Sequence, residues 1–175
     1  MLQTATVAPG TLELLGNLQG EPLLRNTRLV GGTAFIGFIH GVKIDVIYHP
    51  FPWLEEAMEE DGFRIAAKTD IVAMKMHAII NSGTRPKDFV DIAFLSMYFS
   101  YNEMKRLLLR RYPAYDPIMV DRAVIYFEDI EDALIAEISM IGYEFDFERI
   151  KNRISKMTDN PDKVYVTAPL KLQRQ

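Results

Sequence analysis

Residues 28–50, which read RLVGGTAFIGFIHGVKIDVIYHP, decide how the first part of the chain folds. Two apolar runs flank His40-Gly41, and the glycine accepts the positive φ that a two-residue turn demands. The runs therefore predict a β-hairpin. The preceding segment, TRLVGG, predicts a short strand that ends at Gly31-Gly32, and Pro50 and Pro52 end the second arm of the hairpin.

Helical patterns surround this hairpin. The leucines of residues 11–20 recur at helical spacing behind a Thr11 cap, and residues 53–60, WLEEAMEE, predict a short helix with a solvated acidic face. Further helices are predicted, in chain order, for TDIVAMKMHAIINSG from a Thr69 or Asp70 cap to Gly83, KDFVDIAFLSMYF, NEMKRLLLRRYP, DPIMVDRAVIYFED behind an Asp116 cap, and DFERIKNRISKM with Phe147, Ile150, Ile154 and Met157 on one stripe. The patterns predict an α+β fold, in which a small mixed sheet precedes a helical half.

Length and composition predict a single globular domain. The chain has 175 residues, of which 49% are apolar, and this is enough for one domain with a core. We expect the domain to cover residues 1–157, with the sheet part in residues 11–53 and a mainly helical part in residues 54–157. The polar tail, residues 158–175, carries two prolines, and we expect it to be poorly ordered unless it docks.

Charge and residue content exclude several classes of protein. A net charge of −4 and a pI near 5.4 argue against a generally basic nucleic-acid binder, although a local basic patch remains open. The absence of cysteine excludes disulfides, thiolate nucleophiles and cysteine-ligated metals. No serine lies in a nucleophile-elbow pattern, and VGGTA lacks the Gly-Lys-Ser ending of a P-loop. Neither a signal peptide nor an apolar run of roughly 20 residues is present, so we expect a soluble, cytoplasmic protein without membrane contact.

A few charged side chains stand in positions that need an explanation. Asp45, in an apolar strand, is either an ordinary exposed residue or a carboxylate that faces a metal-phosphate site. Asp88 and Asp91 share a helix face, and Lys87 lies four residues before Asp91, so this group is either a surface ion pair or a functional one. Lys75 lies in an apolar helix, where its ammonium must extend to solvent or meet an anion. The histidines show no metal-ligand spacing.

Taken in order, three segments resemble a known family. Residues 11–34 (TLELLGNLQGEPLLRNTRLVGGTA), 41–54 (GVKIDVIYHPFPWL) and 71–95 (IVAMKMHAIINSGTRPKDFVDIAFL) resemble the AbiEii/AbiGii-type nucleotidyltransferases. That family is known mostly as the toxin half of bacterial toxin-antitoxin and phage-defence pairs. The likeness covers about residues 11–155. Its most specific feature is the order of Gly-Gly-Thr-Ala, Lys-x-Asp on a strand, a helical lysine, and Lys-Asp-x-x-Asp at the start of the next helix.

The resemblance implies a nucleotidyltransferase-like fold and a phosphoryl-transfer chemistry. In the family, strand carboxylates hold Mg²⁺ on a nucleoside triphosphate while an acceptor hydroxyl attacks the α-phosphate. Carried over by position, the resemblance implies that Asp45 is the ligand of Mg²⁺. It implies that Lys87, Asp88 and Asp91 are also catalytic, as a base or as groups that position the nucleotide. It implies contacts to the nucleotide for Gly31, Gly32, Thr33, Lys43 and Lys75.

The chain departs from the family between Ala34 and Phe35. There the family carries a helix and a strand with Ser-x-Asp-x-Asp, and this internal block, with its pair of metal-binding carboxylates, is absent. We therefore expect a truncated member that binds nucleotide weakly and is impaired in transferring a nucleoside monophosphate to an RNA, such as a tRNA, or to a protein. The alternative is a catalytically silent module that binds a partner antitoxin. Apolar sheet surface left by the lost strand favours a homo-oligomer.

Overall fold

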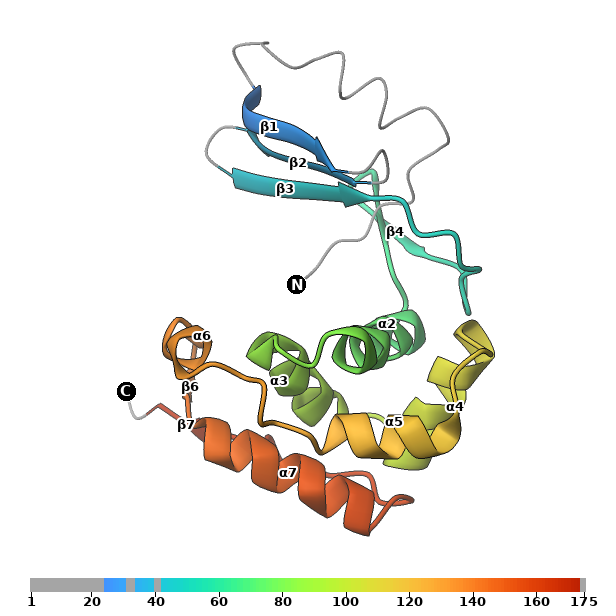
Figure 1. Cartoon of the computed structure of the whole chain (residues 1–175), viewed down its shortest axis with the longest axis vertical. Coiled ribbons are helices and arrows are strands. Elements are labelled where there is room, and N and C mark those ends of the chain that lie inside the picture. The colour runs from blue at the N-terminus through green and yellow to red at the C-terminus, as the bar shows by residue number, and fades with distance from the viewer. Residues whose placement is uncertain (1–23, 31–33, 40–41, 174–175) are drawn as a thin grey trace. The chain divides into compact units, whose positions relative to one another are not determined.

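The computed structural model describes residues 24–30, 34–39 and 42–173, and these divide into two compact units (Figure 1). The strand unit comprises the described residues up to Pro52 together with Glu56–Ala66. The helical unit comprises Trp53–Glu55 and the described residues from Ala67 onward. Strands dominate the first unit and helices the second, which confirms the predicted α+β class. The single domain expected over residues 1–157 stays a prediction.

The strand unit contains a sheet of three antiparallel strands in the order β1-β2-β3. These are β1 (Leu24–Val30), β2 (Ala34–Ile39) and β3 (Val42–Ile47). Ile39 pairs with Val42, so the strands are joined through residues 40–41, and the predicted hairpin is confirmed. The predicted Gly31-Gly32 stop, the His40-Gly41 turn itself and the helix predicted for residues 11–20 lie outside the described residues.

The helix predicted for residues 53–60 is wrong. Its second half forms β4 (Met58–Glu60), which pairs with β5 (Phe63–Ile65) in a second hairpin. The two strands are joined by Asp61 at φ 51° and Gly62 at φ 79°. Two successive residues with positive φ form the tight turn that Asp-Gly strongly favours, and this local signal outweighs the helix preference of the glutamates. The glutamates are solvent-exposed, as the sequence predicts.

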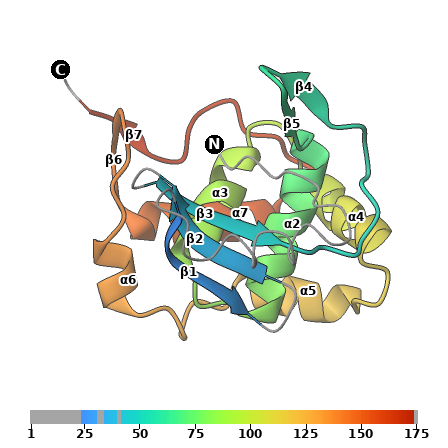
Figure 2. The ribbon, with the colours of Figure 1, turned by 90° about the horizontal axis from the view of Figure 1, so that it is seen from above.

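The helical unit contains the five helices that the sequence predicts and one that it does not, α6 (Asp132–Ala136); the helix predicted to run to Asp129 ends at Val124. In chain order, the helices are α2 (Lys68–Asn81), α3 (Pro86–Leu95), α4 (Tyr101–Arg111), α5 (Pro117–Val124), the short α6 and α7 (Phe147–Asp159). Asp116 caps α5 and Pro117 takes its first position, as predicted. α4 begins with a reciprocal capping box between Ser100 and Glu103. Figure 2 shows α2 beside α4, and these two helices pack against each other.

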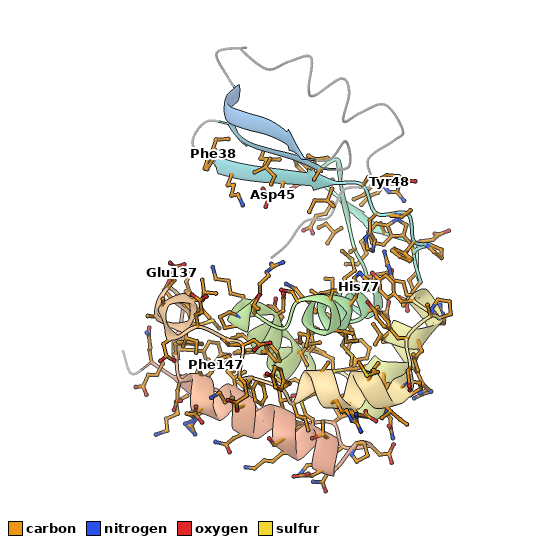
Figure 3. All side chains as sticks on the ribbon, viewed as in Figure 1. Phe38, Asp45, Tyr48, His77, Glu137 and Phe147 are labelled. Carbon is orange, nitrogen blue, oxygen red and sulfur yellow. The ribbon has the colours of Figure 1, made fainter. Side chains whose placement is uncertain are left out.

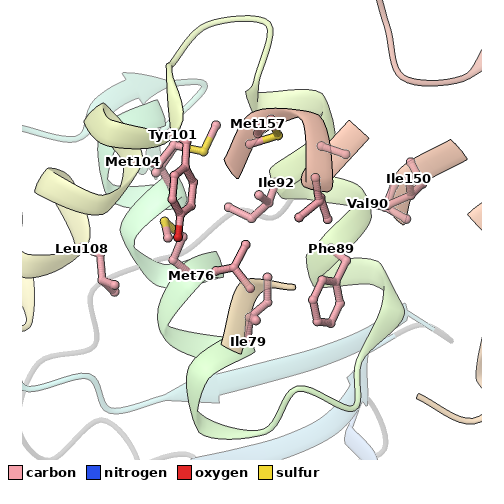
Figure 4. Close-up of a cluster of buried hydrophobic side chains, with 14 of the residues drawn as sticks. Met76, Ile79, Phe89, Val90, Ile92, Tyr101, Met104, Leu108, Ile150 and Met157 are labelled. Carbon is pink, nitrogen blue, oxygen red and sulfur yellow. The ribbon is translucent and has the colours of Figure 1, made fainter. Parts of the chain in front are cut away.

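One apolar core holds the helical unit together. α2 packs against α3, α4 and α5, and α3 packs against α7. Figure 4 shows the buried side chains of Met76, Ile92, Leu108 and Met157 gathered from four of these helices. The predicted stripe on α7 is confirmed, because Phe147, Ile150, Ile154 and Met157 are all buried. Removing this apolar area from water is the main stabilising contribution to the unit.

The segment after α7 docks on the helical unit. Tyr165 N donates a hydrogen bond of 2.9 Å to Ser96 O, and Arg153 Nη2 donates one of 2.9 Å to Thr167 O. Tyr165 and Leu170 are buried. A short ladder then pairs β6 (Tyr143–Glu144) with β7 (Lys171–Leu172), which the sequence analysis did not predict. The docking that the sequence left open for this tail is therefore observed over residues 158–173.

Candidate functional site

Lys75 on α2 meets two carboxylates of α3. Its Nζ atom lies 2.7 Å from Asp88 Oδ1 and 2.7 Å from Asp91 Oδ2. We call these three residues the Lys75 cluster. Of the two outcomes that the sequence leaves open for Lys75, the structure shows the second, because the ammonium meets anions inside the helical unit.

The turn between α2 and α3 brings these side chains together. Gly83 follows α2 with φ +66°, a left-handed conformation in which any side chain would be strained. Pro86 then occupies the first turn of α3, where its fixed φ suits a helix start. Asp88 lies in the same turn, and the positive end of the helix macrodipole favours its carboxylate there. Asp91, three residues later, shares its face as predicted.

Burial and pairing set the charge state of the cluster. The side chains of Lys75 and Asp88 are 11% and 2% exposed, whereas that of Asp91 is 42% exposed. Arg85 Nε approaches Asp88 Oδ2 at 3.4 Å from the exposed side. Burial alone would lower the pKa of Lys75, but hydrogen bonds to Asp88 and Asp91 and the charges of both carboxylates outweigh it, so the pKa lies above its usual 10.5. Lys75 is therefore an ammonium at neutral pH.

This arrangement leaves two groups able to bind a ligand. An ammonium carries three N–H groups, and Lys75 uses two of them on Asp88 and Asp91, so the third can serve an incoming oxygen. The half-exposed carboxylate of Asp91 can accept a hydrogen bond from a hydroxyl. With Arg85 included, two cations balance two carboxylates. The cluster thus offers positioned donors and acceptors rather than a strong net field.

Asp45 lies on β3 in the strand unit (Figure 3), and it pairs with Lys43 of the same strand. Lys43 Nζ lies 3.0 Å from Asp45 Oδ2, and the side chains are 56% and 40% exposed. Within the residues described, no three or more His, Cys, Asp or Glu side chains gather in a way that could hold a metal. A single strand carboxylate that is paired with an ammonium does not fit the two-metal site that the resemblance implies.

Comparison with known proteins supplies the context for this geometry. A family model described as "Nucleotidyl transferase AbiEii toxin, Type IV TA system" matches residues 25–168, which is most of the chain. The chain belongs to the AbiEii nucleotidyl transferase toxin family. The resemblance inferred from the ordered motifs is thereby confirmed, and the observed strands and helices agree with a nucleotidyltransferase-like α+β fold. The matched region, residues 25–168, is called the AbiEii domain below.

A curated relative of this AbiEii domain is an uncharacterized protein of Aquifex aeolicus (strain VF5). It is 28% identical over 129 residues, which cover 71% of this chain and 62% of the relative. The chain thus spans less than two thirds of that protein's length. No solved structure matches. No helix in the described parts of the AbiEii domain is long and apolar enough to cross a membrane.

The structure brings together only some of the site residues that the AbiEii resemblance implies. Lys75, Asp88 and Asp91 form one cluster in the helical unit. Lys87 is exposed on α3, and the expected pair between Lys87 and Asp91 is not found, because Asp91 pairs with Lys75. Helical geometry explains this, since Lys75 on the neighbouring helix α2 reaches Asp91 from the buried side. The remaining implied residues, Gly31, Gly32 and Thr33, lie outside the described residues.

Sequence reasoning missed a buried ion pair between Asp70 and Arg111. The sequence predicts a cap at Thr69 or Asp70, but Ala67 occupies the N-cap position without a side-chain cap, and Asp70 is fully buried in the first turn. Its carboxylate accepts hydrogen bonds from Leu54 N at 2.9 Å and Glu55 N at 3.2 Å, and it pairs with Arg111 Nη1. The available signal was the spacing of Arg111, which continues the apolar stripe of α4 after Met104 and Leu108.

His77 lies on α2, where aromatic and polar side chains engage its ring (Figure 3). Its ring stacks on that of Tyr112, with centroids 4.1 Å apart and an interplanar angle of 7°. Its Nδ1 lies 2.6 Å from Tyr115 Oη, and Asn81 Nδ2 donates to the same hydroxyl at 2.9 Å. Burial, and then the charge of Arg111, lower the pKa of His77 below its usual 6.5.

This lowered pKa predicts a pH dependence of stability. The unfolded chain binds a proton at His77 near pH 6.5, whereas the folded protein resists it, so protons favour unfolding. We expect the free energy of unfolding to fall as the pH is lowered from about 7.5 to about 5.5, above the range in which carboxylates titrate. Urea titrations across this range measure it. The His77→Gln variant should show a flatter profile, and an unchanged slope in that variant would contradict the assignment.

Proposed function

We propose that this AbiEii domain binds a nucleoside triphosphate through the Lys75 cluster and transfers a nucleoside monophosphate from it to an RNA, such as a tRNA, or to a protein hydroxyl, with impaired efficiency. The observation that carries the proposal is the clamped ammonium of Lys75, which lies 2.7 Å from both Asp88 and Asp91. Family membership over residues 25–168 supports the reaction class.

Each residue of the cluster has a separate role in this proposal. Lys75 donates its third N–H to a phosphate oxygen of the nucleotide. Asp88 is a positioning residue, because its buried carboxylate fixes Lys75 without being accessible itself. Asp91 is half-exposed and accepts a hydrogen bond from a hydroxyl of the nucleotide or of the acceptor. Holding the reacting groups in place supplies a large share of catalysis in phosphoryl transfer.

The carboxylates of the strand unit are the reason to expect impaired transfer of the nucleoside monophosphate. Asp45 is exposed and paired with Lys43, and the Asp-x-Asp strand that the family places beside it is absent from the sequence. The donor set therefore does not fit Mg²⁺ in the arrangement that the resemblance implies, and the proposal assigns no step to that ion. The proposal assigns nucleotide binding to the Lys75 cluster and gives Asp45 no part in it.

A transfer assay tests the proposed impairment. We expect the purified chain, given α-labelled nucleoside triphosphates, Mg²⁺ and total tRNA, to label the acceptor weakly at most. Because Asp45 is one isolated carboxylate, the Asp45→Ala variant should label it to the same low extent. Efficient Mg²⁺-dependent labelling that Asp45→Ala abolishes would contradict the impairment and would restore Asp45 as a metal ligand.

A second candidate function is a catalytically silent module that binds a cognate antitoxin. The ion pair between Lys43 and Asp45 favours this silent module, because the charge of the Asp45 carboxylate is already balanced by an ammonium rather than by a metal ion. Exposed apolar residues of β3, Val42 at 64% and Ile47 at 58%, also suit a partner or a second copy of the chain. Static light scattering of the purified chain distinguishes a second copy from a different partner. A dimer would support the second copy, and a monomer would argue against the homo-oligomer.

A further inference from the structure

A pocket of about 350 Å³ lies in the helical unit between the start of α2 and α4. Its lining residues are Thr69, Phe99, Glu103, Arg106, Leu107 and Arg110. None of them belongs to the Lys75 cluster. We call it the α2–α4 pocket.

Two arginines on one face of α4 make the pocket positive. Arg106 and Arg110 lie four residues apart, and both are exposed. Arg106 Nε donates to Asn102 O at 3.4 Å, and Arg110 Nη2 donates to Leu54 O at 2.8 Å. Neither guanidinium has an ion-pair partner among the described residues. Most of their N–H donors therefore remain available to an anion.

Glu103 is the opposing charge in the lining. Its carboxylate accepts hydrogen bonds of 2.8 Å from both the backbone N and the Oγ of Ser100. These hydrogen bonds lower the pKa of Glu103, so it stays ionised at neutral pH. The same bonds hold it in the capping box of α4. Two guanidiniums against one engaged carboxylate leave the pocket with a net positive charge.

The opposite wall of the pocket adds uncommitted donors. Thr69 Oγ1 is buried and has no hydrogen-bond partner within residues 24–30, 34–39 and 42–173. Thr69 lies in the first turn of α2, whose N-cap residue, Ala67, offers no side-chain cap. The first backbone N–H groups of a helix lack partners within it and carry the positive end of the macrodipole. An anion held by the arginines would therefore lie near this end of α2 and could accept a hydrogen bond from Thr69 Oγ1.

The rest of the lining is apolar and includes an aromatic ring. Phe99 and Leu107 are half-buried beside the charged rim. Arginines bind phosphate in a bidentate manner, and an aromatic ring stacks with a base. We propose that the α2–α4 pocket binds one nucleotide unit, with its phosphate between Arg106, Arg110 and the start of α2 and its base against Phe99 and Leu107. The unit belongs either to a single-stranded RNA or to a free nucleotide.

Fluorescence anisotropy with a labelled single-stranded RNA of about twelve nucleotides tests the proposal on the whole chain. Arg106→Gln should weaken RNA binding about tenfold, and Thr69→Val should weaken it to a lesser extent. The slope of log Kd against log salt should fall by about 0.7 in Arg106→Gln, as expected for one lost phosphate contact. The matched control is Arg122→Gln on α5, an equally exposed arginine that should bind within about twofold of the parent.

A second arm, calorimetry with ATP, identifies the source of the nucleotide unit. RNA binding that depends on Arg106 supports an RNA source. ATP binding that depends on Arg106, without RNA binding, supports a free nucleotide. Equal effects of Arg106→Gln and Arg122→Gln, or an absence of Arg106-dependent binding of both RNA and ATP, would overturn the proposal. Failure of this proposal is distinguishable from failure of the proposed function, because the pocket and the Lys75 cluster share no residue: ATP binding that Lys75→Met abolishes and Arg106→Gln leaves unchanged would belong to the Lys75 cluster alone.

Discussion

Replacing Asp70 by asparagine is expected to lower the free energy of unfolding by about 3–5 kcal/mol, because it leaves a buried guanidinium without its counter-charge. Asp70 and Arg111 are both fully buried, and among the residues that the structure describes Arg111 Nε and Nη2 have no hydrogen-bond partner. Asparagine also keeps only one of the two acceptor oxygens that now receive hydrogen bonds from Leu54 N and Glu55 N. Urea unfolding followed by circular dichroism at neutral pH measures the change.

An exposed ion pair supplies the control for this prediction. Glu148 pairs with Lys151 at 2.7 Å, but its side chain is 72% exposed, so Glu148→Gln should change stability by less than about 1 kcal/mol. The double variant Asp70→Leu with Arg111→Met should recover part of the loss, since two apolar groups need no counter-charge. A loss in Asp70→Asn no larger than that in Glu148→Gln would show that the buried pair contributes little.

The Asp70 pair illustrates what local patterns leave out. Asp70 and Arg111 are separated by 41 positions, so no local spacing links them. The carboxylate looked like a cap because caps and first-turn acids use the same residue types at nearly the same place. Only the fold decides that Asp70 instead satisfies the backbone of residues 54 and 55.

Secondary structure followed the sequence wherever one signal dominated. The β2–β3 hairpin and the α7 stripe were predicted because alternation and helical spacing are unambiguous there. The hairpin of residues 58–65 was not predicted, because the glutamate-rich run there favours a helix while Asp61-Gly62 favours a turn, and the turn prevails. The β6–β7 ladder joins residues far apart in sequence, and strands of two residues carry no periodicity.

The candidate site was predictable in part for the same reason. The spacing of Asp88 and Asp91 placed both on one helix face, and the apolar setting of Lys75 required an anion or solvent. Lys75 meets Asp88 and Asp91 only because the turn at Gly83 folds α3 back onto α2. The sequence marks Gly83 as a helix end but does not predict how the two helices pack. Lys87 has the helical spacing to pair with Asp91, but Asp91 pairs with the buried Lys75 of the neighbouring helix α2 instead.

Nucleotide binding should stabilise the chain, and variants of the Lys75 cluster should lose that effect. A ligand present at 100 times its dissociation constant adds about 2.7 kcal/mol to the free energy of unfolding. For a chain of this length, this corresponds to a rise in Tm of about 5–10 °C. Lys75→Met removes the proposed phosphate contact. Because Lys75→Met also removes the buried cation beside Asp88 and leaves only Arg85 on the exposed side, Asp91→Asn provides a milder variant at the half-exposed end of the cluster.

The most direct test of the central claim is therefore thermal melting with ATP, GTP, CTP or UTP in the presence of Mg²⁺. The account predicts a rise in Tm with at least one nucleotide for the parent chain and for Lys156→Met, an exposed lysine of α7 outside the cluster. It predicts that the rise is lost in Lys75→Met and strongly reduced in Asp91→Asn. An absence of any rise in the parent chain, or an equal rise in all four proteins, would contradict the assignment of nucleotide binding to the Lys75 cluster.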